Sequence, residues 1–379
     1  MKITPARNHY VSRTSLLQPL FLLVALSAPS FLGGCASAPA QQRPTPPTVA
    51  ELTYAKVHVF YATDRTPVGD PHSTTYGNTR GNSLSYGACD VCVPKDNKMG
   101  DLDASFTILG FSTLRYNQAS TVSILNVSRS DESSLLADIA SKAALSSGNA
   151  LIFIHGFNNS FSDAARRTAQ ITYDLGFSGA PIFFSWPCKG TVTGYIDDEA
   201  TIGWAEHDVR KFLSDVASDP AIHNIYIISH SMGNRAATHA VLDIAALRPD
   251  LASKIKWMIL AAPDIDAGEF ADDVGPRLVS AKMRVTLYSS TTDNALKLSQ
   301  DLHAFPRAGD SSPPLVVSGI ETVDASSVDV DIGLRHDYAF ARAVMGDIYA
   351  IVYQGADAAH RFGLTEVPVQ AGSYWVFQP

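Results

Sequence analysis

The chain has 379 residues, of which 46% are hydrophobic and 17% are charged. This length can form one large α/β domain or two smaller ones. The formal net charge of −8 leaves no basic surface of the kind that binds nucleic acid, so we expect no nucleic-acid partner. The acidic residues are spread along the chain, a distribution that favours solubility and indicates no particular partner.

The first 34 residues have the features of a bacterial lipoprotein signal peptide. Lys2, Arg7 and Arg13 form a basic region, and the apolar run LLQPLFLLVALSAPSFL ends just before Gly33-Gly34-Cys35. This ending resembles a lipobox, which implies cleavage before Cys35 and attachment of lipid to its thiol. The lipids would anchor the chain to a membrane surface without spanning it. The alternatives are an ordinary secretory signal and a membrane helix, for which the run is short.

A flexible linker is expected between this anchor and the folded part of the chain. Residues 35–51 begin with the cysteine and continue as a Pro-, Ala- and Gln-rich stretch without apolar periodicity, which is typical of an extended tether. The sequence therefore predicts one folded domain at 52–379. Ala36, rather than an aspartate, follows the cysteine, which in enterobacterial lipoproteins favours the outer membrane. We expect the protein in the cell envelope, on the periplasmic side of the outer membrane.

Three cysteines remain for the folded domain: Cys89, Cys92 and Cys188. Cys89 and Cys92 form a C-x-x-C pattern, but ACDVCVP has the composition of a strand, whereas redox motifs of this spacing open a helix. The sequence therefore favours buried structural thiols, or one disulfide bond to Cys188 in an oxidising compartment, over a redox role.

The first part of the domain has strand-like segments. Residues 57–63, 88–93 and 121–127 are rich in β-branched and aromatic side chains. Residues 131–145 have helical spacing, with acidic residues in the first turn. Asp64 and Arg65 follow the first strand, and we interpret them as a buried ion pair that holds it.

From residue 149 onward, continuous apolar runs alternate with helical patterns. The runs are those of strands buried on both faces, namely NALIFIHG (149–156), PIFFSWP (181–187), NIYIISH (224–230), IKWMILAAP (255–263) and MRVTLYSS (283–290). A weaker strand follows at 318–326. The helical segments are 160–176, 198–218, 231–247, a helix from about Asn294, and 337–354. This alternation predicts an α/β fold whose mostly parallel sheet has helices on both faces. The tail from Gly355 onward has no pattern that we can interpret.

Ser231 is the candidate nucleophile. It lies in ISHSMGNRA, between a buried strand and a helix, which is the context that a nucleophile elbow requires. The motif is G-x-S-x-G with Ser229 in place of the first glycine, and Gly233 supplies the second. Small residues are needed at both positions because the chain reverses sharply there. The alternative is a serine that only caps the following helix.

Backbone amides near the serine are candidate donors to an oxyanion. Residues 154–157, IHGF, end a buried strand and are similar to the oxyanion loop of esterases and lipases. We expect the N–H groups of Phe157 and Met232 to form the oxyanion hole. The alternative for this stretch is a glycine that merely ends a strand.

A serine nucleophile needs a base and an acid that orients the base. In α/β hydrolases these follow the serine in the order acid, then histidine. Asp293 ends the strand at 283–290 on the edge where such sites form, although it could merely cap the next helix. Asp266, and then Asp264, are the alternative acids, because both follow the preceding strand. We expect Asp293 to be the acid.

Beyond the helix that follows the serine, which contains the badly placed His239, three histidines remain as candidates. His303 comes soon after the candidate acid, with no strand between them, and His360 lies in the tail. His336 follows the last predicted strand and precedes the last helix, which is the position of the base. Its ordinary pKa near 6.5 suits proton transfer at neutral pH.

With these residues in place, the chain resembles the α/β hydrolases, and more narrowly the bacterial DUF900 family of esterase- or lipase-like proteins. The resemblance covers about residues 55–355 and is carried by FYATDR, FIHGFN, FSWP, SHSMGN, LAAPDID, LYSSTTDNAL and the HDY segment at 336–338. It implies an α/β-hydrolase fold with an eight-stranded sheet and a serine-hydrolase triad. It carries over Ser231 as nucleophile, His336 as base and Asp293 as acid, and implies no substrate.

The expected function is hydrolysis of a carboxylic ester, of a small molecule or a lipid, through an acyl-enzyme. We expect no cofactor and no metal, because Glu206, His207 and Asp208 point in three directions on one helix. The segment between Trp186 and Trp204 is rich in glycine, tyrosine and acidic residues. We expect it to form part of the wall of the substrate-binding site. Two alternatives stay open: an acyltransferase with the same triad, and a non-catalytic envelope lipoprotein that uses the fold for binding.

Overall fold

The computed structural model describes residues 53–69, 75–96, 99–100, 121–189, 191, 194–328 and 336–378. The predicted signal peptide, the predicted lipidation site Cys35 and the whole predicted linker lie outside these residues. Among the described residues, no helix is both long enough and apolar enough to cross a membrane.

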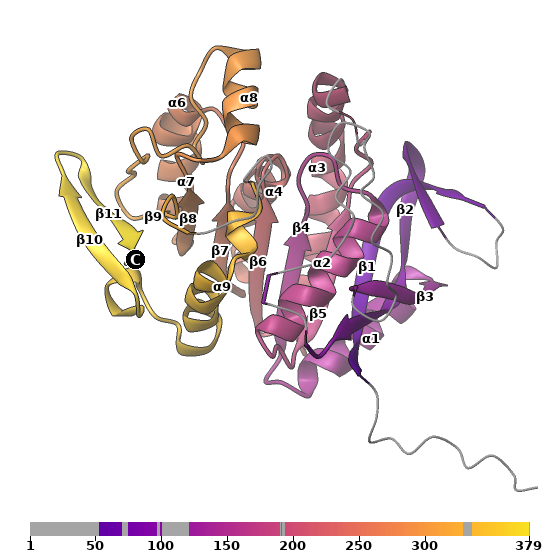
Figure 1. The fold of residues 1–379 in the computed structure, drawn as a ribbon. Coiled ribbons are helices and arrows are strands. Elements are labelled where there is room, and N and C mark those ends of the chain that lie inside the picture. The colour runs from indigo at the N-terminus through magenta and orange to yellow at the C-terminus, as the bar shows by residue number, and fades with distance from the viewer. Residues whose placement is uncertain are drawn as a thin grey trace, which may run out of the picture. The chain divides into compact units, whose positions relative to one another are not determined.

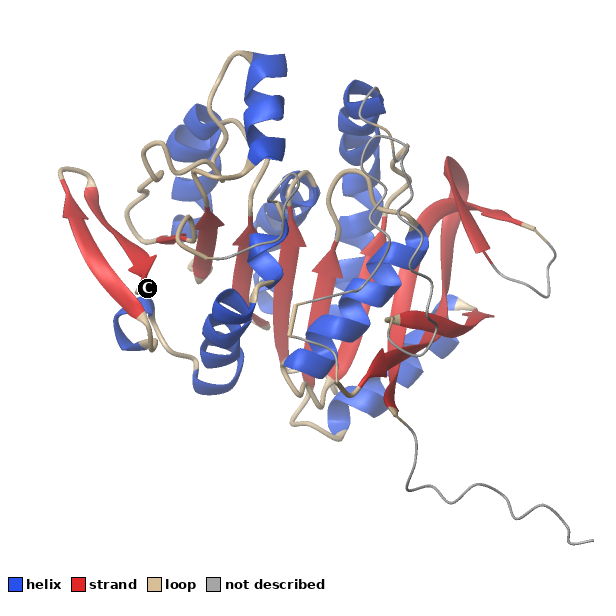
Figure 2. Cartoon of the chain, viewed as in Figure 1, coloured by secondary structure: helices blue, strands red, loops and turns tan. Residues whose placement is uncertain are grey.

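One mixed sheet runs through the domain, in the order β10-β11-β9-β8-β7-β6-β4-β5-β1-β2-β3 (Figures 1 and 2). The strands from β11 to β1 in this order are parallel to their neighbours, and antiparallel strands flank them at both ends. Their bounds are β1 (Tyr54–Val68), β2 (Thr75–Pro94), β3 (Ser123–Ser130), β4 (Asn149–Ile154), β5 (Ala180–Ser185), β6 (Asn224–His230), β7 (Ile255–Ala261), β8 (Val285–Ser289), β9 (Glu321–Asp324), β10 (Leu364–Val369) and β11 (Gly372–Phe377).

Helices cover both faces of the sheet. α1, α3, α4 and α7 contribute buried side chains to one core cluster, whereas α2 and α9 contribute to the other. Figure 1 shows α2 and α9 on the same side of the strands. The helices are α1 (Glu132–Ala144), α2 (Phe161–Asp174), α3 (Tyr195–Ser218), α4 (Gly233–Leu247), α5 (Pro249–Ala252), α6 (Ala267–Glu269), α7 (Gly275–Ser280), α8 (Asn294–His303) and α9 (Arg342–Tyr349), with short turns η3 (Phe270–Val274), η4 (Asp337–Phe340), η5 (Ala350–Gln354) and η6 (Ala358–His360).

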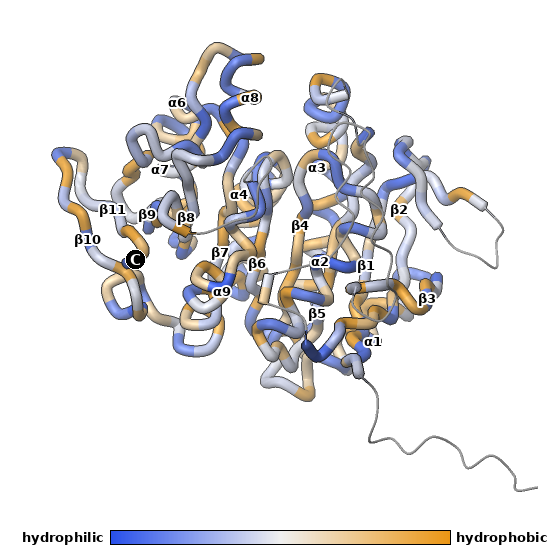
Figure 3. The backbone as a smooth tube through the Cα atoms, viewed as in Figure 1, coloured by the Kyte–Doolittle hydropathy of each residue, from blue (hydrophilic) through white to orange (hydrophobic). Residues whose placement is uncertain are grey.

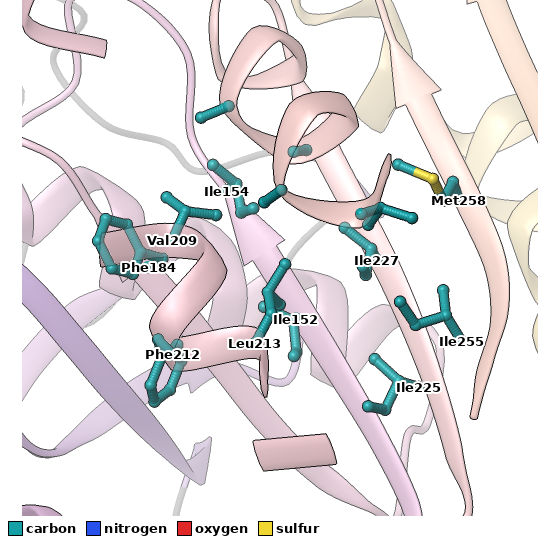
Figure 4. Packing of buried hydrophobic residues seen from close by; sticks show 14 of the residues in the cluster. Ile152, Ile154, Phe184, Val209, Phe212, Leu213, Ile225, Ile227, Ile255 and Met258 are labelled. Atoms are coloured by element: carbon teal, nitrogen blue, oxygen red, sulfur yellow. The ribbon is translucent and has the colours of Figure 1, made fainter. Parts of the chain in front are cut away.

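The two cores follow from side-chain alternation along each strand. In β4, Ile152 and Ile154 pack in the cluster under α3 and α4, while Leu151 and Phe153 belong to the cluster under α2 and α9. Figure 4 shows the first cluster, where Phe212 and Leu213 of α3 meet the isoleucines of β4 and β6. The central strands accordingly carry many hydrophobic residues (Figure 3). A strand that is apolar on both sides must be buried between two helix layers.

The predicted fold class is confirmed, and the implied number of strands is wrong. The described residues form eleven strands rather than eight, because β2 continues the sheet beyond β1 and the tail adds the hairpin of β10 and β11. The hairpin occupies one end of the sheet and β3 the other (Figure 1). The tail that we could not interpret is therefore ordered: β11 pairs in parallel with β9 through Trp375 and Val376.

The cysteines of the domain are buried free thiols. Cys89, Cys92 and Cys188 form no disulfide bond, so the alternative of a bridge to Cys188 is wrong. Cys89 and Cys92 both lie in β2, the strand setting that the sequence predicted. Burial raises the pKa of Cys188, and burial raises that of Cys89 beyond the ordinary range of thiols. A buried thiol with a raised pKa is a poor nucleophile.

Candidate active site

The candidate residues gather where the order of the sheet reverses. The chain leaves β4 in one direction to β5 and in the other to β6, so the carboxyl ends of β4 and β6 form a topological switch point. Ligands of open α/β sheets bind at such points. Phe157 follows β4 and Ser231 follows β6, so both lie at this crevice.

Ser231 has the strained backbone of a nucleophile elbow. Its φ is 52°, in the left-handed region that costs a non-glycine residue about 1–3 kcal/mol. The turn is also tightly packed. A Cβ added to Gly156 would lie 2.6 Å from the Cβ of Ser231, and one added to Gly233 would lie 2.4 Å from the carbonyl oxygen of His155. A serine that only caps a helix needs neither the strain nor these close approaches.

Ser229, which replaces the usual glycine, is accommodated by a polar partner. Its hydroxyl donates to Oδ1 of Asn234 at 2.6 Å. The Asn234 amide in turn donates to the carbonyls of Ser231 and Ala261, at 2.8 and 3.1 Å. All these groups are buried. The extra hydroxyl therefore joins a hydrogen-bonded clamp that ties the elbow to the end of β7.

Asp293 and His336 form a hydrogen-bonded pair. Nδ1 of His336 donates to Oδ2 of Asp293 at 2.6 Å. The other carboxylate oxygen of Asp293 accepts the backbone N–H groups of Ala295 and Leu296, both at 3.0 Å, and so caps α8. The two functions that the sequence offered as alternatives for Asp293, partner of the histidine and helix cap, are both present.

The alternative acids are engaged elsewhere. Asp264 accepts hydrogen bonds from the hydroxyls of Tyr195 and Ser299. Asp266 caps the short helix α6 through the N–H groups of Gly268 and Glu269. Neither carboxylate contacts an imidazole nitrogen of His336, whose carboxylate partner is Asp293.

His336 is also held by the residue before the candidate nucleophile. Nε2 of His230 donates to the carbonyl oxygen of His336 at 3.2 Å, and the two rings are 4.5 Å apart. Nε2 of His336 is buried and has no hydrogen-bonding partner among the described residues, Ser231 included. Bonds between nucleophile and base often form fully only when substrate is bound. His230 is a site residue that the sequence analysis set aside, although its place beside Ser231 could have indicated it.

The pKa values of the two imidazoles are shifted in opposite directions. Burial lowers the pKa of His336, but the carboxylate of Asp293, together with those of Asp337 and Asp264, raises it, so the net pKa lies above the ordinary value. Burial and the adjacent His336 lower the pKa of His230 to about 3. His230 is therefore neutral at ordinary pH, whereas the protonated form of His336 is favoured.

The loop after β4 is held by a buried arginine. Arg65 is fully buried, and Nη2 donates to the carbonyl of Asn159 at 2.7 Å while Nε donates to the hydroxyl of Ser185 at 2.8 Å. His155 stacks on Trp186, with ring centroids 5.2 Å apart. These contacts hold the residues on both sides of Phe157 in place.

The predicted ion pair between Asp64 and Arg65 is wrong. Arg65 uses its donors on the loop contacts, and both carboxylate oxygens of Asp64 lack a hydrogen-bonding partner among the described residues. Neighbours on a strand point to opposite faces, so a pair between them is geometrically unfavourable. Burial raises the pKa of Asp64 to about 8.

The segment between Trp186 and Trp204 is largely helical, because α3 begins at Tyr195, earlier than predicted. Residues 190, 192 and 193 lie outside the described residues. Further along α3, Glu206 pairs with His239 and His207 with Asp208. The described residues contain no group of three or more His, Cys, Asp or Glu side chains that could hold a metal ion.

A parallel sheet between two helix layers, with a strained serine at the turn after β6, defines the class of α/β hydrolases. Within that class the chain belongs to the DUF900 family, described as an alpha/beta hydrolase of unknown function, whose sequence model matches residues 129–352. The family expected from the sequence motifs is confirmed. No curated protein matches the chain.

Several solved structures are similar to this chain at low identity. An uncharacterized protein from Bacillus cereus ATCC 10987 is 10% identical, with a TM-score of 0.35, over 55% of this chain and 61% of that one. The match therefore spans less than two thirds of the length of the Bacillus cereus protein. An esterase from Pyrobaculum calidifontis is 11% identical, with a TM-score of 0.34, over 72% and 82% of the two chains. A thermostable esterase from Pseudomonas putida ECU1011 is 11% identical, with a TM-score of 0.29, over 78% and 81%.

Proposed function

We propose that the protein is a serine hydrolase that cleaves carboxylic esters through an acyl-enzyme. The observation that carries the proposal is the strained φ of 52° at Ser231, combined with the 2.6 Å hydrogen bond between His336 and Asp293 after neighbouring strands of the same sheet. Strain of this kind is retained where the surrounding structure enforces it, and it concentrates at functional sites.

In the proposed mechanism, Oγ of Ser231 attacks the ester carbonyl carbon while Nε2 of His336 takes the hydroxyl proton. The new Oγ–C bond gives a tetrahedral oxyanion, which accepts hydrogen bonds from the N–H groups of Phe157 and Met232. Collapse breaks the bond to the leaving alcohol, which receives the proton from His336. Water then repeats the sequence on the acyl-enzyme and releases the acid. Asp293 orients the imidazole and stabilises its protonated form.

Labelling with a fluorophosphonate probe tests the nucleophile directly. We expect the purified full-length protein to be labelled and to turn over p-nitrophenyl esters, and the Ser231→Ala variant to lose both. Ser141→Ala is the matched control, because Ser141 is an exposed serine on α1 that only bonds the carbonyl of Ala137. A folded wild type that is neither labelled nor active would reject catalysis and leave a binding role as the better account.

We also propose that Cys35 carries lipid and anchors the protein to the outer membrane. The support is the sequence Leu32-Gly33-Gly34-Cys35 after an apolar run. Metabolic labelling with an alkyne fatty acid tests this: label should enter the wild type and the Ser37→Ala control but not Cys35→Ser. Release of an unlabelled, shortened wild-type chain into the periplasm would contradict it and indicate an ordinary secretory signal.

A further inference from the structure

A cavity lined by many charged side chains lies between α3, α4 and the segment at 303–307. Its volume is about 360 Å³, within the range of small-molecule sites. Arg235, four residues after Ser231, lines one wall. Arg307 and the apolar side chains of Ile202 and Ile265 line it as well. Ser231 is not part of the lining, so the cavity is distinct from the nucleophile.

Arg307 is a buried cation with unsatisfied donors. Only 3% of the residue is exposed, yet its Nε and Nη2 have no hydrogen-bonding partner among the described residues. Its nearest anionic atom there is Oδ1 of Asp264, 3.4 Å from Nε. Guanidinium groups carry five donors, and leaving them buried and unbonded is costly. A ligand with anionic oxygens would satisfy them.

Asp264 pairs with Arg307 without a well-formed hydrogen bond, and other groups share this carboxylate. The hydroxyl of Ser299 donates to its Oδ1 at 2.6 Å, and the hydroxyl of Tyr195 donates to its Oδ2. Nη2 of Arg235 lies 3.8 Å from Oδ1 as well. One carboxylate therefore lies between two guanidinium groups while it accepts hydrogen bonds from two hydroxyls.

Arg235 itself is largely engaged. Its Nε donates to the carbonyl of Asp264 at 2.7 Å, and its Nη1 pairs with Glu199, which also contacts His303 at 3.2 Å. Arg307 is thus the cation of this cavity whose hydrogen-bonding capacity is least used among the described lining residues.

The outer part of the cavity is acidic. Asp266 and Glu206 are half-buried and Glu269 is exposed. Glu206 pairs with His239 at 2.9 Å, and one oxygen of Asp266 caps α6. The four lining carboxylates, which also include Glu199, outnumber the two lining arginines, so a simple anion would be repelled on entry.

We propose that this cavity binds a zwitterionic group, with its anionic end against Arg307 and its ammonium end against Asp266 and Glu269. This arrangement satisfies the buried guanidinium and places the positive charge at the acidic mouth. Ile202, Ile265 and the exposed ring of Phe305 contact the carbon chain between the two charges. The proposal goes beyond ester hydrolysis and does not depend on it.

Isothermal titration of the full-length Ser231→Ala protein tests the proposal without any catalysis. The probes are phosphoethanolamine and β-alanine, which are zwitterions with a phosphate or a carboxylate, together with inorganic phosphate and ethanolamine. We expect one of the zwitterions to bind at least about tenfold more tightly than phosphate or ethanolamine, because each charged end adds a charge-assisted contact. Which zwitterion binds identifies the anionic group.

Substitutions separate the two ends of the ligand. Arg307→Met should abolish binding of the zwitterion, whereas Glu269→Gln should reduce its preference over inorganic phosphate. Glu269 is exposed, so this variant tests the proposal even where Arg307→Met does not fold. Glu366→Gln, an exposed glutamate on β10, is the matched control and should change nothing. Equal binding of zwitterion and phosphate, no binding of any probe, or binding unaffected by both substitutions would each overturn the proposal.

Discussion

Asp293 divides its two carboxylate oxygens between the imidazole of His336 and the first turn of α8. One oxygen accepts a hydrogen bond from Nδ1 of His336. The other accepts backbone N–H groups and caps α8. Asparagine is as good a helix cap as aspartate, but it cannot stabilise a protonated imidazole. The two functions can therefore be separated by a single substitution.

We predict that Asp293→Asn lowers kcat for a p-nitrophenyl ester by roughly 10⁴-fold with little change in thermal stability, because the amide loses the negative charge and favours the wrong tautomer of the base. Asp131→Asn is the matched control, since Asp131 caps α1 through the N–H of Ser134, on a helix outside the candidate site. Comparable activity in the two variants would show that Asp293 is only a cap.

The raised pKa of His336 predicts the direction of the pH dependence. The base must be neutral to take the serine proton, so kcat/KM should fall as pH drops through its pKa. Because the carboxylates of Asp293, Asp337 and Asp264 together outweigh burial and raise this pKa, the midpoint should lie above the ordinary 6.5. Asp293→Asn removes the largest of these raising contributions, so the midpoint should move downward. A wild-type midpoint below 6.5 would contradict this assignment.

His230 is predicted to position the base rather than to react. Glutamine can place its amide nitrogen near the position of the imidazole Nε2, whereas phenylalanine fills the volume without a donor. We expect kcat to fall about tenfold in His230→Phe, the effect of losing one hydrogen bond, and to be largely retained in His230→Gln. KM and the pH midpoint should stay unchanged, because His230 has a pKa of about 3 and is neutral throughout. Equal losses in both variants would point to packing instead.

At the element scale, the elbow is predicted to depend on glycine at 156. A Cβ there would meet Cβ of Ser231 at 2.6 Å and the carbonyl of His230 at 2.9 Å, and neither backbone segment can move freely. Gly156→Ala should lower the free energy of unfolding by about 1–3 kcal/mol and reduce activity. Gly346→Ala, in α9 with nothing within 4 Å, should instead raise it by about 0.5–1 kcal/mol. Urea unfolding of both variants measures the contrast, and equal effects would refute it.

Strands that are buried on both faces were predictable from sequence, and the terminal hairpin of β10 and β11 was not. The strands β4 to β8 are continuous apolar runs, because each lies between two helix layers. β10 is half-buried or exposed throughout, so it has no apolar pattern, and its pairing with β11 supplies the order instead. A short stretch of sequence does not show which other parts of the chain will pair with it or bury it.

The candidate site shows the same division. The order of serine, acid and histidine along the chain and their places after strands were sufficient to select Ser231, Asp293 and His336. The contacts that support them were not, because the His230 bond to His336 joins residues 106 positions apart. The wrong ion pair between Asp64 and Arg65 could have been avoided from the sequence alone, because neighbouring side chains on a strand point to opposite faces.

At the scale of the whole molecule, Arg361 ties the C-terminal segment to the sheet. This buried arginine donates to Asp347 of α9 at 2.9 Å and to Glu321 of β9 at 2.7 Å. Asp347 also accepts the hydroxyl of Tyr288, on β8, at 2.5 Å. One guanidinium thus joins α9 and two strands just before the terminal hairpin.

We therefore predict that Arg361→Met lowers the free energy of unfolding by about 3–5 kcal/mol, because it leaves Asp347 buried without its cation. The loss of unfolding free energy should shrink as pH falls. Burial already raises the pKa of Asp347, and removal of Arg361 raises it further. At lower pH the carboxylate therefore takes up a proton and no longer bears an unpaired charge. Arg248→Met, which removes an exposed pair with Asp250, should cost far less stability. Urea unfolding at neutral and mildly acidic pH tests both statements. If the two arginine variants lose the same stability, the C-terminal segment is held by its strand pairing alone, and the buried cluster around Asp347 contributes nothing to it.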